Sequence, residues 1–161
     1  MAHRRHFLTL LAATTLTGTV LPGSFAQAAP GVEIEVLKSP GCGCCEAWAD
    51  LARERGYTVS VQEFDDSAAQ KAALGVPEDL TGCHTAQAGG YLFEGHVPFE
   101  AIDAVLRDKP AIAGLAVTGM PMGSPGMGND PATRFDVIAF GGTASAGQFF
   151  YRAGTADPFA G

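Results

Sequence analysis

Cysteine residues are concentrated in two short segments of the 161-residue sequence. Three of the four cysteines, Cys42, Cys44 and Cys45, lie in SPGCGCCEAW. The fourth, Cys83, is followed directly by His84 in TGCHTA. Cysteine thiolates attack disulfide bonds and also bind soft metal ions, so the two segments predict either thiol–disulfide chemistry or a metal site.

The spacing of Cys42 and Cys45 is the C-x-x-C spacing of a dithiol oxidoreductase. That chemistry needs only these two residues, leaves Cys44 as a spare thiol and gives no role to Cys83. A pocket of four thiolates accounts for all four cysteines. We therefore favour a metal-binding protein over an enzyme.

Three methionines, Met120, Met122 and Met127, lie in the Gly/Pro-rich segment GMPMGSPGM. Their spacing has no apolar periodicity that would indicate a place in a core. Thioether sulfur is a soft, neutral ligand that suits Cu(I) and contributes little to zinc binding. The segment therefore indicates capture or transfer of copper, with packing of the loop as the alternative.

Zinc is the main alternative metal, because four cysteines can form a tetrahedral thiolate site. Such sites usually combine two C-x-x-C pairs, whereas the second half here is Cys83 alone. Cu(I) accepts two or three thiolates and bridges them, so irregular spacing is less of an obstacle. The spacing favours copper.

Two histidines are further candidates. His84 and His96, the latter in EGHVP, are ligands or hydrogen-bonding neighbours of the site, with a purely structural role as the alternative for each. Because successive side chains of a strand point to opposite faces, Cys83 and His84 cannot easily bind the same ion.

Two predicted strands and a helix must position the first cysteine segment. Residues 32–37 and 57–64 alternate between apolar and polar residues, as half-buried strands do. Residues 45–56 form a predicted helix closed by Gly56. Strands joined through a helix imply a right-handed crossover and a parallel pair. The cysteines then lie at a helix N-terminus, where backbone N–H groups favour the thiolate.

The remaining elements must bring Cys83 to the same place. Turn and cap residues divide the rest of the chain, with Gly89-Gly90 as a hairpin signal and Asp66 or Ser67 as a helix cap. The predicted elements are a helix at 65–75, strands at 83–89 and 90–98, a helix at 98–110, a long loop at 111–133, and a strand pair at 134–140 and 147–152.

The β-α-β-α-β-β-α order, with cysteines at the first strand-to-helix turn, resembles the thioredoxin fold. The resemblance implies a single α/β domain in which the start of the third strand faces the first helix turn. Cys83 would then project toward the first cysteine segment. Thioredoxin-type enzymes place a proline at that position, and CHTA has none, which weakens the redox interpretation.

Residues 1–28 are predicted to be a signal peptide, with a basic start, an apolar run and the cleavage pattern AQA. The segment RRHFL fits twin-arginine export, with an ordinary Sec signal as the alternative. The apolar run is too short for a convincing membrane span. We therefore expect a periplasmic protein whose single domain is residues 29–161.

Charge and compartment restrict the function further. The net charge of −7 argues against nucleic acid and anionic lipid as partners. In an oxidising compartment, four cysteines would by default form two disulfides. Bridges within the first segment would close very short loops and stabilise little, so structural disulfides are not favoured.

Four segments together resemble a family of small periplasmic proteins associated with bacterial copper resistance, the CopG-like metal-binding proteins. They are KSPGCGCCEAW, GVPEDLTGCHTA, GYLFEGHVP and GLAVTGMPMGSPGM. The resemblance implies a thioredoxin-like fold that binds copper through Cys42, Cys44, Cys45 and Cys83. The other motif positions it matches, with less defined roles, are His84, His96, Met120, Met122 and Met127.

The sequence therefore predicts a periplasmic copper-binding protein for copper resistance or trafficking. Cu(I) is expected in a four-cysteine pocket, with a link to thiol redox chemistry kept open. The expected partners are copper ions and other periplasmic copper-handling proteins. The alternatives are a thiol–disulfide oxidoreductase of the cell envelope and a structural zinc domain.

Overall fold

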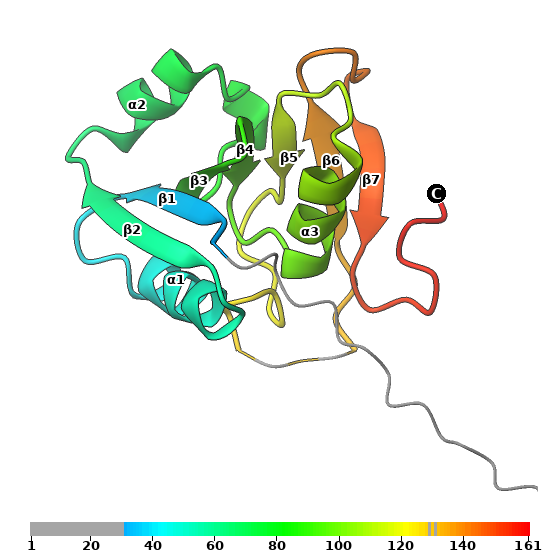
Figure 1. Cartoon of the computed structure of the whole chain (residues 1–161), viewed down its shortest axis with the longest axis horizontal. Coiled ribbons are helices and arrows are strands. Elements are labelled where there is room, and N and C mark those ends of the chain that lie inside the picture. Colours follow the sequence, from blue (N-terminus) through cyan, green and yellow to red (C-terminus); the bar gives the residue numbers. More distant parts are fainter. Residues whose placement is uncertain (1–30, 129, 131) are drawn as a thin grey trace, which may run out of the picture.

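The computed structural model describes residues 31–128, 130 and 132–161 (Figure 1). The predicted signal peptide, residues 1–28, lies outside these residues. The described chain forms a seven-stranded mixed sheet with three α-helices, which confirms the predicted α/β class. No helix of these residues combines the length and apolar character needed to cross a bilayer.

The order of elements follows the predicted order closely up to the third helix. The elements are β1 (Glu33–Lys38), α1 (Gly43–Glu54), β2 (Thr58–Glu63), α2 (Ser67–Leu74), the 3-10 helix η1 (Glu78–Leu80), β3 (His84–Ala88), β4 (Tyr91–Glu94), α3 (Phe99–Asp108), β5 (Gly114–Ala116), β6 (Asp136–Phe140) and β7 (Gln148–Arg152). The strand order in the sheet is β2-β1-β3-β4-β5-β6-β7.

Local signals explain the first half of the fold. β1 and β2 pair in parallel across α1, as the helical crossover requires. Asp66 caps α2 by accepting a hydrogen bond of 2.9 Å from the N–H of Ala69, and Gly75 ends the helix in the left-handed region. β3 and β4 form the predicted antiparallel hairpin.

The predicted loop of residues 111–133 contains a strand, β5, so this part of the prediction was wrong. β5 has three residues, all buried, and therefore lacks the alternation that marks a half-buried strand. It pairs with β4 and β6 and joins the terminal strand pair to the sheet. Gly114 permits the close packing, because a Cβ there would lie 2.8 Å from the ring of Phe140.

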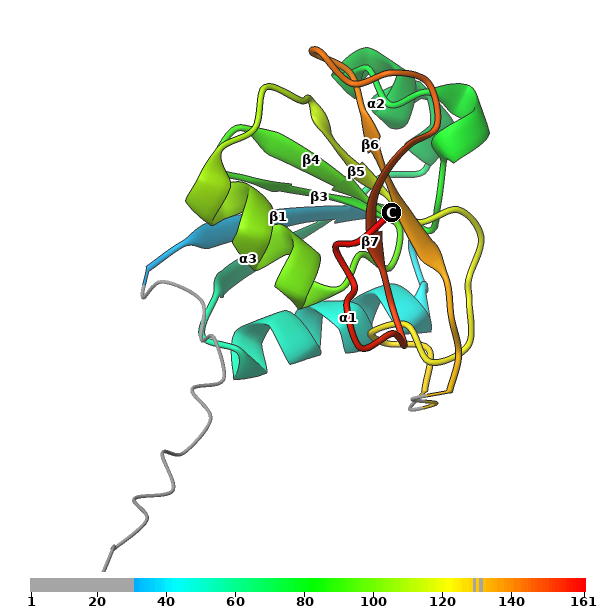
Figure 2. The same ribbon diagram turned by 90° about the vertical axis from the view of Figure 1, so that its right-hand side faces the viewer.

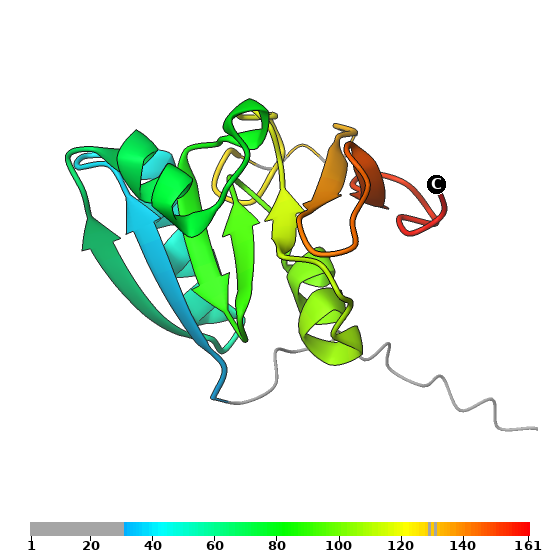
Figure 3. The same cartoon turned by 90° about the horizontal axis from the view of Figure 1, so that it is seen from above.

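The helices cover both faces of the sheet. α1 and α3 lie on one face and α2 lies on the other (Figures 2 and 3). The main core lies on the face of α1 and α3 and includes Trp48 and Phe99. A smaller cluster on the other face contains Val76, Ala116 and Phe140.

Candidate metal centre

The two cysteine segments meet because β1 and β3 are antiparallel neighbours. Lys38, the last residue of β1, pairs with His84, the first residue of β3. The chain therefore leaves β1 toward Cys42 at the same end of the sheet at which it enters β3 from Cys83. The structure brings the two segments together, as the sequence predicts.

Cys42 and Cys45 form a disulfide bond in the first turn of α1. One helical turn separates them and brings their Cα atoms to 5.4 Å, within the range that a disulfide requires. The sequence does not favour structural disulfides, whereas the structure contains one between these two cysteines. The helix turn makes the bond geometrically possible, although the short loop that it closes means that the bond stabilises the fold little.

Cys44 and Cys83 are the free cysteines. Their Sγ atoms lie 3.9 Å apart, and the Sγ of Cys44 lies 3.5 Å from that of Cys42. Both free residues are partly exposed. Neighbouring thiols can bind a soft metal ion, and a thiol beside a disulfide can also exchange with it.

His96 adds a ring nitrogen to the two free thiols. One donor atom from each of Cys44, Cys83 and His96 lies within 4.8 Å of the others. Nδ1 of His96 lies 2.7 Å from the carbonyl oxygen of Pro125. Because a carbonyl only accepts, Nδ1 carries the hydrogen and Nε2 keeps its lone pair. Nε2 is buried without a hydrogen-bond partner, in the tautomer that a metal ligand needs.

Two glycines set the separation of Cys83 and His96. A Cβ on Gly82 would lie 2.6 Å from the Cα of Gly95, so the two backbones approach more closely than other residue types allow. Gly95 also has a positive φ of 72°. Gly82 precedes Cys83 and Gly95 precedes His96, so their contact brings the two candidate ligands together.

His84 lies beside this cluster on the core side of the sheet. Its ring centroid is 4.8 Å from that of Trp48 and 5.1 Å from that of His96. Both ring nitrogens are buried without a partner, and burial lowers the pKa of His84 to about 3. The ring is therefore neutral at physiological pH. Among the described residues, His84 belongs to neither group of three close donor atoms.

The methionine loop (residues 119–128) packs on the start of α1 through its backbone. A Cβ on Gly126 would lie 2.7 Å from the carbonyl oxygen of Cys44. The side chains of Met120 and Met122 are instead 55% and 61% exposed, and Met127 is half-buried. The loop therefore adjoins the sulfur cluster while two of its thioethers face solvent.

The segment that contains Cys83, His84, His96 and the methionines matches a family model. Residues 80–127 match the family described as "Protein of unknown function, DUF411". A solved structure titled "Copper resistance protein copG- Form 1" is 38% identical, with 71% of this chain and 93% of that chain covered and a TM-score of 0.64. For "Copper resistance protein copG- Form 2" the values are 36%, 75%, 94% and 0.65.

The chain belongs to the CopG family. No curated protein matches it. The alignment covers nearly all of each solved CopG chain and a smaller share of this chain.

The Cys83 thiol of this CopG-family protein is protonated at physiological pH. Burial, followed by the neighbouring Cys44, raises the pKa of the Cys83 thiol to about 11. Cys83 lies before β3 and not in the first turn of α1, where a helix N-terminus would favour the thiolate. A metal ion that binds Cys83 must therefore displace a proton.

Two buried charged residues behind the site could not be identified from the sequence. Lys71 of α2 and Glu94 of β4 form a buried ion pair, and Glu94 accepts the N–H of Gly82. In the sequence both have the appearance of ordinary surface charges. No local pattern distinguishes them, because the burial of β3 and β4 around Glu94 is known only from the structure.

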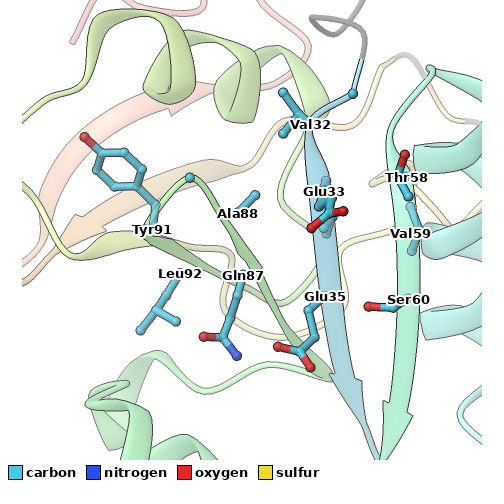
Figure 4. Close-up of a pocket in the computed structure, with 14 residues that line it drawn as sticks. Val32, Glu33, Glu35, Thr58, Val59, Ser60, Gln87, Ala88, Tyr91 and Leu92 are labelled. Atoms are coloured by element: carbon cyan, nitrogen blue, oxygen red, sulfur yellow. The ribbon is translucent and has the colours of Figure 1, made fainter.

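A cavity of about 930 Å³ lies at the other end of the sheet (Figure 4). Its lining includes Glu33 and Glu35 of β1, Thr58 of β2, and Gln87 and Tyr91 beside the β3–β4 turn. No cysteine lines it. Donor chemistry, and not cavity size, therefore identifies the candidate metal centre of this CopG-family protein.

Proposed function

We propose that this CopG-family protein binds copper, as Cu(I), in the cell envelope for copper resistance or trafficking. The observation that carries the proposal is the cluster of Cys44, Cys83 and His96, whose donor atoms lie within 4.8 Å of one another. The titles of its two solved relatives, which name a copper resistance protein, support the choice of metal.

The donor set fits a copper ion. Two thiols and a neutral imidazole are donors that copper accepts readily. Nε2 of His96 is buried without a partner, and such an atom is unfavourable unless a metal ion or a water binds it. A closed structural zinc site would use four protein ligands, whereas this cluster offers three while the disulfide is intact.

Reduction of the Cys42–Cys45 disulfide completes the four-cysteine pocket that we propose. The bond takes two electrons and two protons from a dithiol reductant, which leaves as a disulfide, and two thiols result. Donor atoms of Cys42, Cys44 and Cys45 lie within 4.8 Å of one another, which supports their joint use. Copper binding would then be linked to the thiol redox state, since reduction doubles the number of available thiols.

The exposed thioethers of Met120 and Met122 are proposed to receive copper before it reaches the thiols. Their exposure, on a loop whose backbone contacts the start of α1, supports this role. Met127 is proposed to assist from its half-buried position. His84 is proposed as a neutral neighbour of His96 and not as a ligand in the disulfide form.

The remaining parts of the proposal concern location and architecture. Residues 1–28 are proposed as a twin-arginine signal, and residues 29–161 as a thioredoxin-like domain in the periplasm. The β1-α1-β2 unit with cysteines at its first turn supports the comparison with thioredoxin. Other copper-handling proteins of the periplasm are the proposed partners.

A thiol–disulfide oxidoreductase is the second candidate. The observation that favours it is the C-x-x-C disulfide, with the free Cys44 Sγ at 3.5 Å from Cys42 Sγ. An insulin-reduction assay, in which the protein catalyses the reduction of insulin disulfides by a dithiol reductant, tests this candidate. We expect weak or no turnover, whereas turnover at the rate of a true oxidoreductase that survives Cys83→Ser would make this the better function.

Copper titration of two forms of the protein tests the main proposal. Protein purified from the periplasm without added metal is analysed for metals and free thiols, then titrated with Cu(I) against a moderate chelator before and after reduction. We expect binding in both forms and a higher stoichiometry after reduction. Cys83→Ser should lower both affinity and stoichiometry, and an unchanged stoichiometry, or equally tight tetrahedral binding of one zinc ion, would refute the proposal.

A further inference from the structure

A buried ion pair lies behind Cys83, on the face of the sheet that α2 covers. The side chains of Lys71 in α2 and Glu94 in β4 are 8% and 0% exposed, and their charged groups are in contact. Neither residue belongs to the cluster of Cys44, Cys83 and His96. The mechanism proposed above makes no use of them.

Glu94 connects this ion pair to the backbone beside Cys83. Its Oε1 accepts the N–H of Gly82 at 2.7 Å, and its Oε2 accepts the hydroxyl of Thr85. Nζ of Lys71 lies 3.2 Å from the same hydroxyl oxygen. Gly82 and Thr85 lie on either side of the pair Cys83-His84, so one carboxylate holds the chain before and after the thiol.

Stability alone does not account for a buried ion pair in this place. Removing two charges from water offsets most of their attraction, and apolar replacements of similar size are often neutral or stabilising. A buried carboxylate does, however, hold a backbone N–H more firmly than a neutral acceptor, because the hydrogen bond is charge-assisted. The ion pair therefore fixes the position of the backbone at Gly82.

We propose that Glu94 is a positioning residue for Cys83. Its carboxylate, neutralised by Lys71, holds the N–H of Gly82 and so keeps the Sγ of Cys83 at 3.9 Å from the Sγ of Cys44. The inference rests on the proposed function only in taking Cys83 as a ligand. The proximity of the two thiols can be measured without copper.

Two double variants separate the hydrogen bond from the charges. K71M/E94Q removes both charges and keeps an oxygen that accepts from Gly82, whereas K71M/E94L removes that oxygen as well and has a similar volume. The probe is phenylarsine oxide, which binds two neighbouring thiols. With the Cys42–Cys45 disulfide intact, Cys44 and Cys83 are the free thiols that can bind it.

We expect the arsenical affinity of K71M/E94Q to lie between that of the unaltered protein and that of K71M/E94L, because the amide oxygen still accepts from Gly82 but less firmly than the carboxylate. The affinity of K71M/E94L should fall about tenfold or more, as the loss of one buried hydrogen bond implies. Each variant is measured well below its own melting temperature, so a loss of stability alone does not alter the measured arsenical affinity. Equal binding by K71M/E94L, or an equal loss in K71M/E94Q, overturns the inference.

An ion pair elsewhere provides the control. Asp136 and Arg152 form a salt bridge between β6 and β7, at the opposite edge of the sheet from β2. D136N/R152Q should leave arsenical affinity unchanged, and a loss equal to that of K71M/E94L would overturn the inference. Copper titration is a separate experiment. If the variants rank as expected in arsenical affinity but the protein does not bind copper, the proposed function is refuted and the role of Glu94 stands.

Hydrogen exchange in the unaltered protein decides the question if K71M/E94L does not fold. The bond to Glu94 predicts that the amide of Gly82 exchanges slowly, although it lies outside every helix and strand. A freely exchanging Gly82 amide overturns the inference.

Discussion

His96 donates the hydrogen of Nδ1 to the carbonyl oxygen of Pro125 at 2.7 Å. The bond joins the segment after β4 to the methionine loop, 29 residues later in the chain. The ring whose Nε2 has no hydrogen-bond partner is therefore oriented by a backbone group. A substitution of the Pro125 side chain would leave this acceptor in place.

Replacing His96 by Phe should weaken Cu(I) binding to the disulfide form by roughly tenfold or more, because one of three donors is lost. The change also removes the hydrogen bond from Nδ1 to the carbonyl oxygen of Pro125, so we expect a loss of about 1 kcal/mol in the free energy of unfolding without loss of the fold. Competition titration against a Cu(I) chelator measures the effect. His84→Phe is the matched control, and an equal or larger loss in that variant would exclude the ligand assignment made here.

Gly126→Ala should lower the free energy of unfolding more than Gly147→Ala. Both glycines have positive φ, of 83° and 69°, so both substitutions strain the backbone by roughly 1 kcal/mol. A Cβ at Gly126 also meets the backbone of Cys44 and Trp48, whereas nothing lies within 4 Å of one at Gly147. We expect an additional loss of about 1–3 kcal/mol in urea unfolding of metal-free protein. Equal losses would show that the loop does not pack on α1.

Replacing Met120 and Met122 by Leu should slow copper uptake and leave the stoichiometry of tight binding unchanged. The two side chains are exposed, so the change removes two thioethers without altering the core. Stopped-flow mixing with a Cu(I)–chelator complex gives the rate. Met127→Leu, at a half-buried position, should have a smaller effect. A double variant that takes up copper at the normal rate would leave the exposed thioethers without a role.

Metal-free protein should lose stability as the pH falls from about 7 to about 5. Burial holds the pKa of His84 at about 3 in the folded protein, against an ordinary value of 6.5. Below about pH 6.5 the unfolded chain therefore takes up a proton that the folded chain does not. The stability present above that pH is lost progressively toward pH 3, with a loss of about 2 kcal/mol at pH 5.

His84→Phe should remove this part of the pH dependence, because the variant has no proton to gain at this position. Urea unfolding at the two pH values measures it. If the unaltered protein and the variant lose stability equally on acidification, the titration of His84 is not responsible.

The elements from β1 to the β3–β4 hairpin could be predicted because their signals are local. Asp66 and Gly75 mark the ends of α2, and Gly89-Gly90 marks the hairpin, each through a conformation that few residue types favour. β5 could not be predicted, because its three buried residues carry no alternation. Its place in the sheet is decided by pairing with β4 and β6, which are distant in sequence.

The candidate site also contains residues that the sequence identifies and groups that only the fold reveals. Residue type identifies Cys44, Cys83 and His96 as donors, and strand pairing explains why they meet. Residue type cannot identify the carbonyl of Pro125, since every residue has one. The buried pair of Lys71 and Glu94 depends on a tertiary contact between α2 and β4, which the sequence patterns of these two segments do not indicate.

The contact between Trp48 and His84 gives the protein an optical reporter of its own. Trp48 is the sole tryptophan in the sequence, its side chain is fully buried, and its ring lies 4.8 Å from that of His84. An indole in such an apolar environment emits at short wavelength, and its excited state is quenched by a redox-active ion nearby. We therefore expect copper bound at the proposed site to change the emission of the unlabelled protein, even in a mixture with a partner that lacks tryptophan.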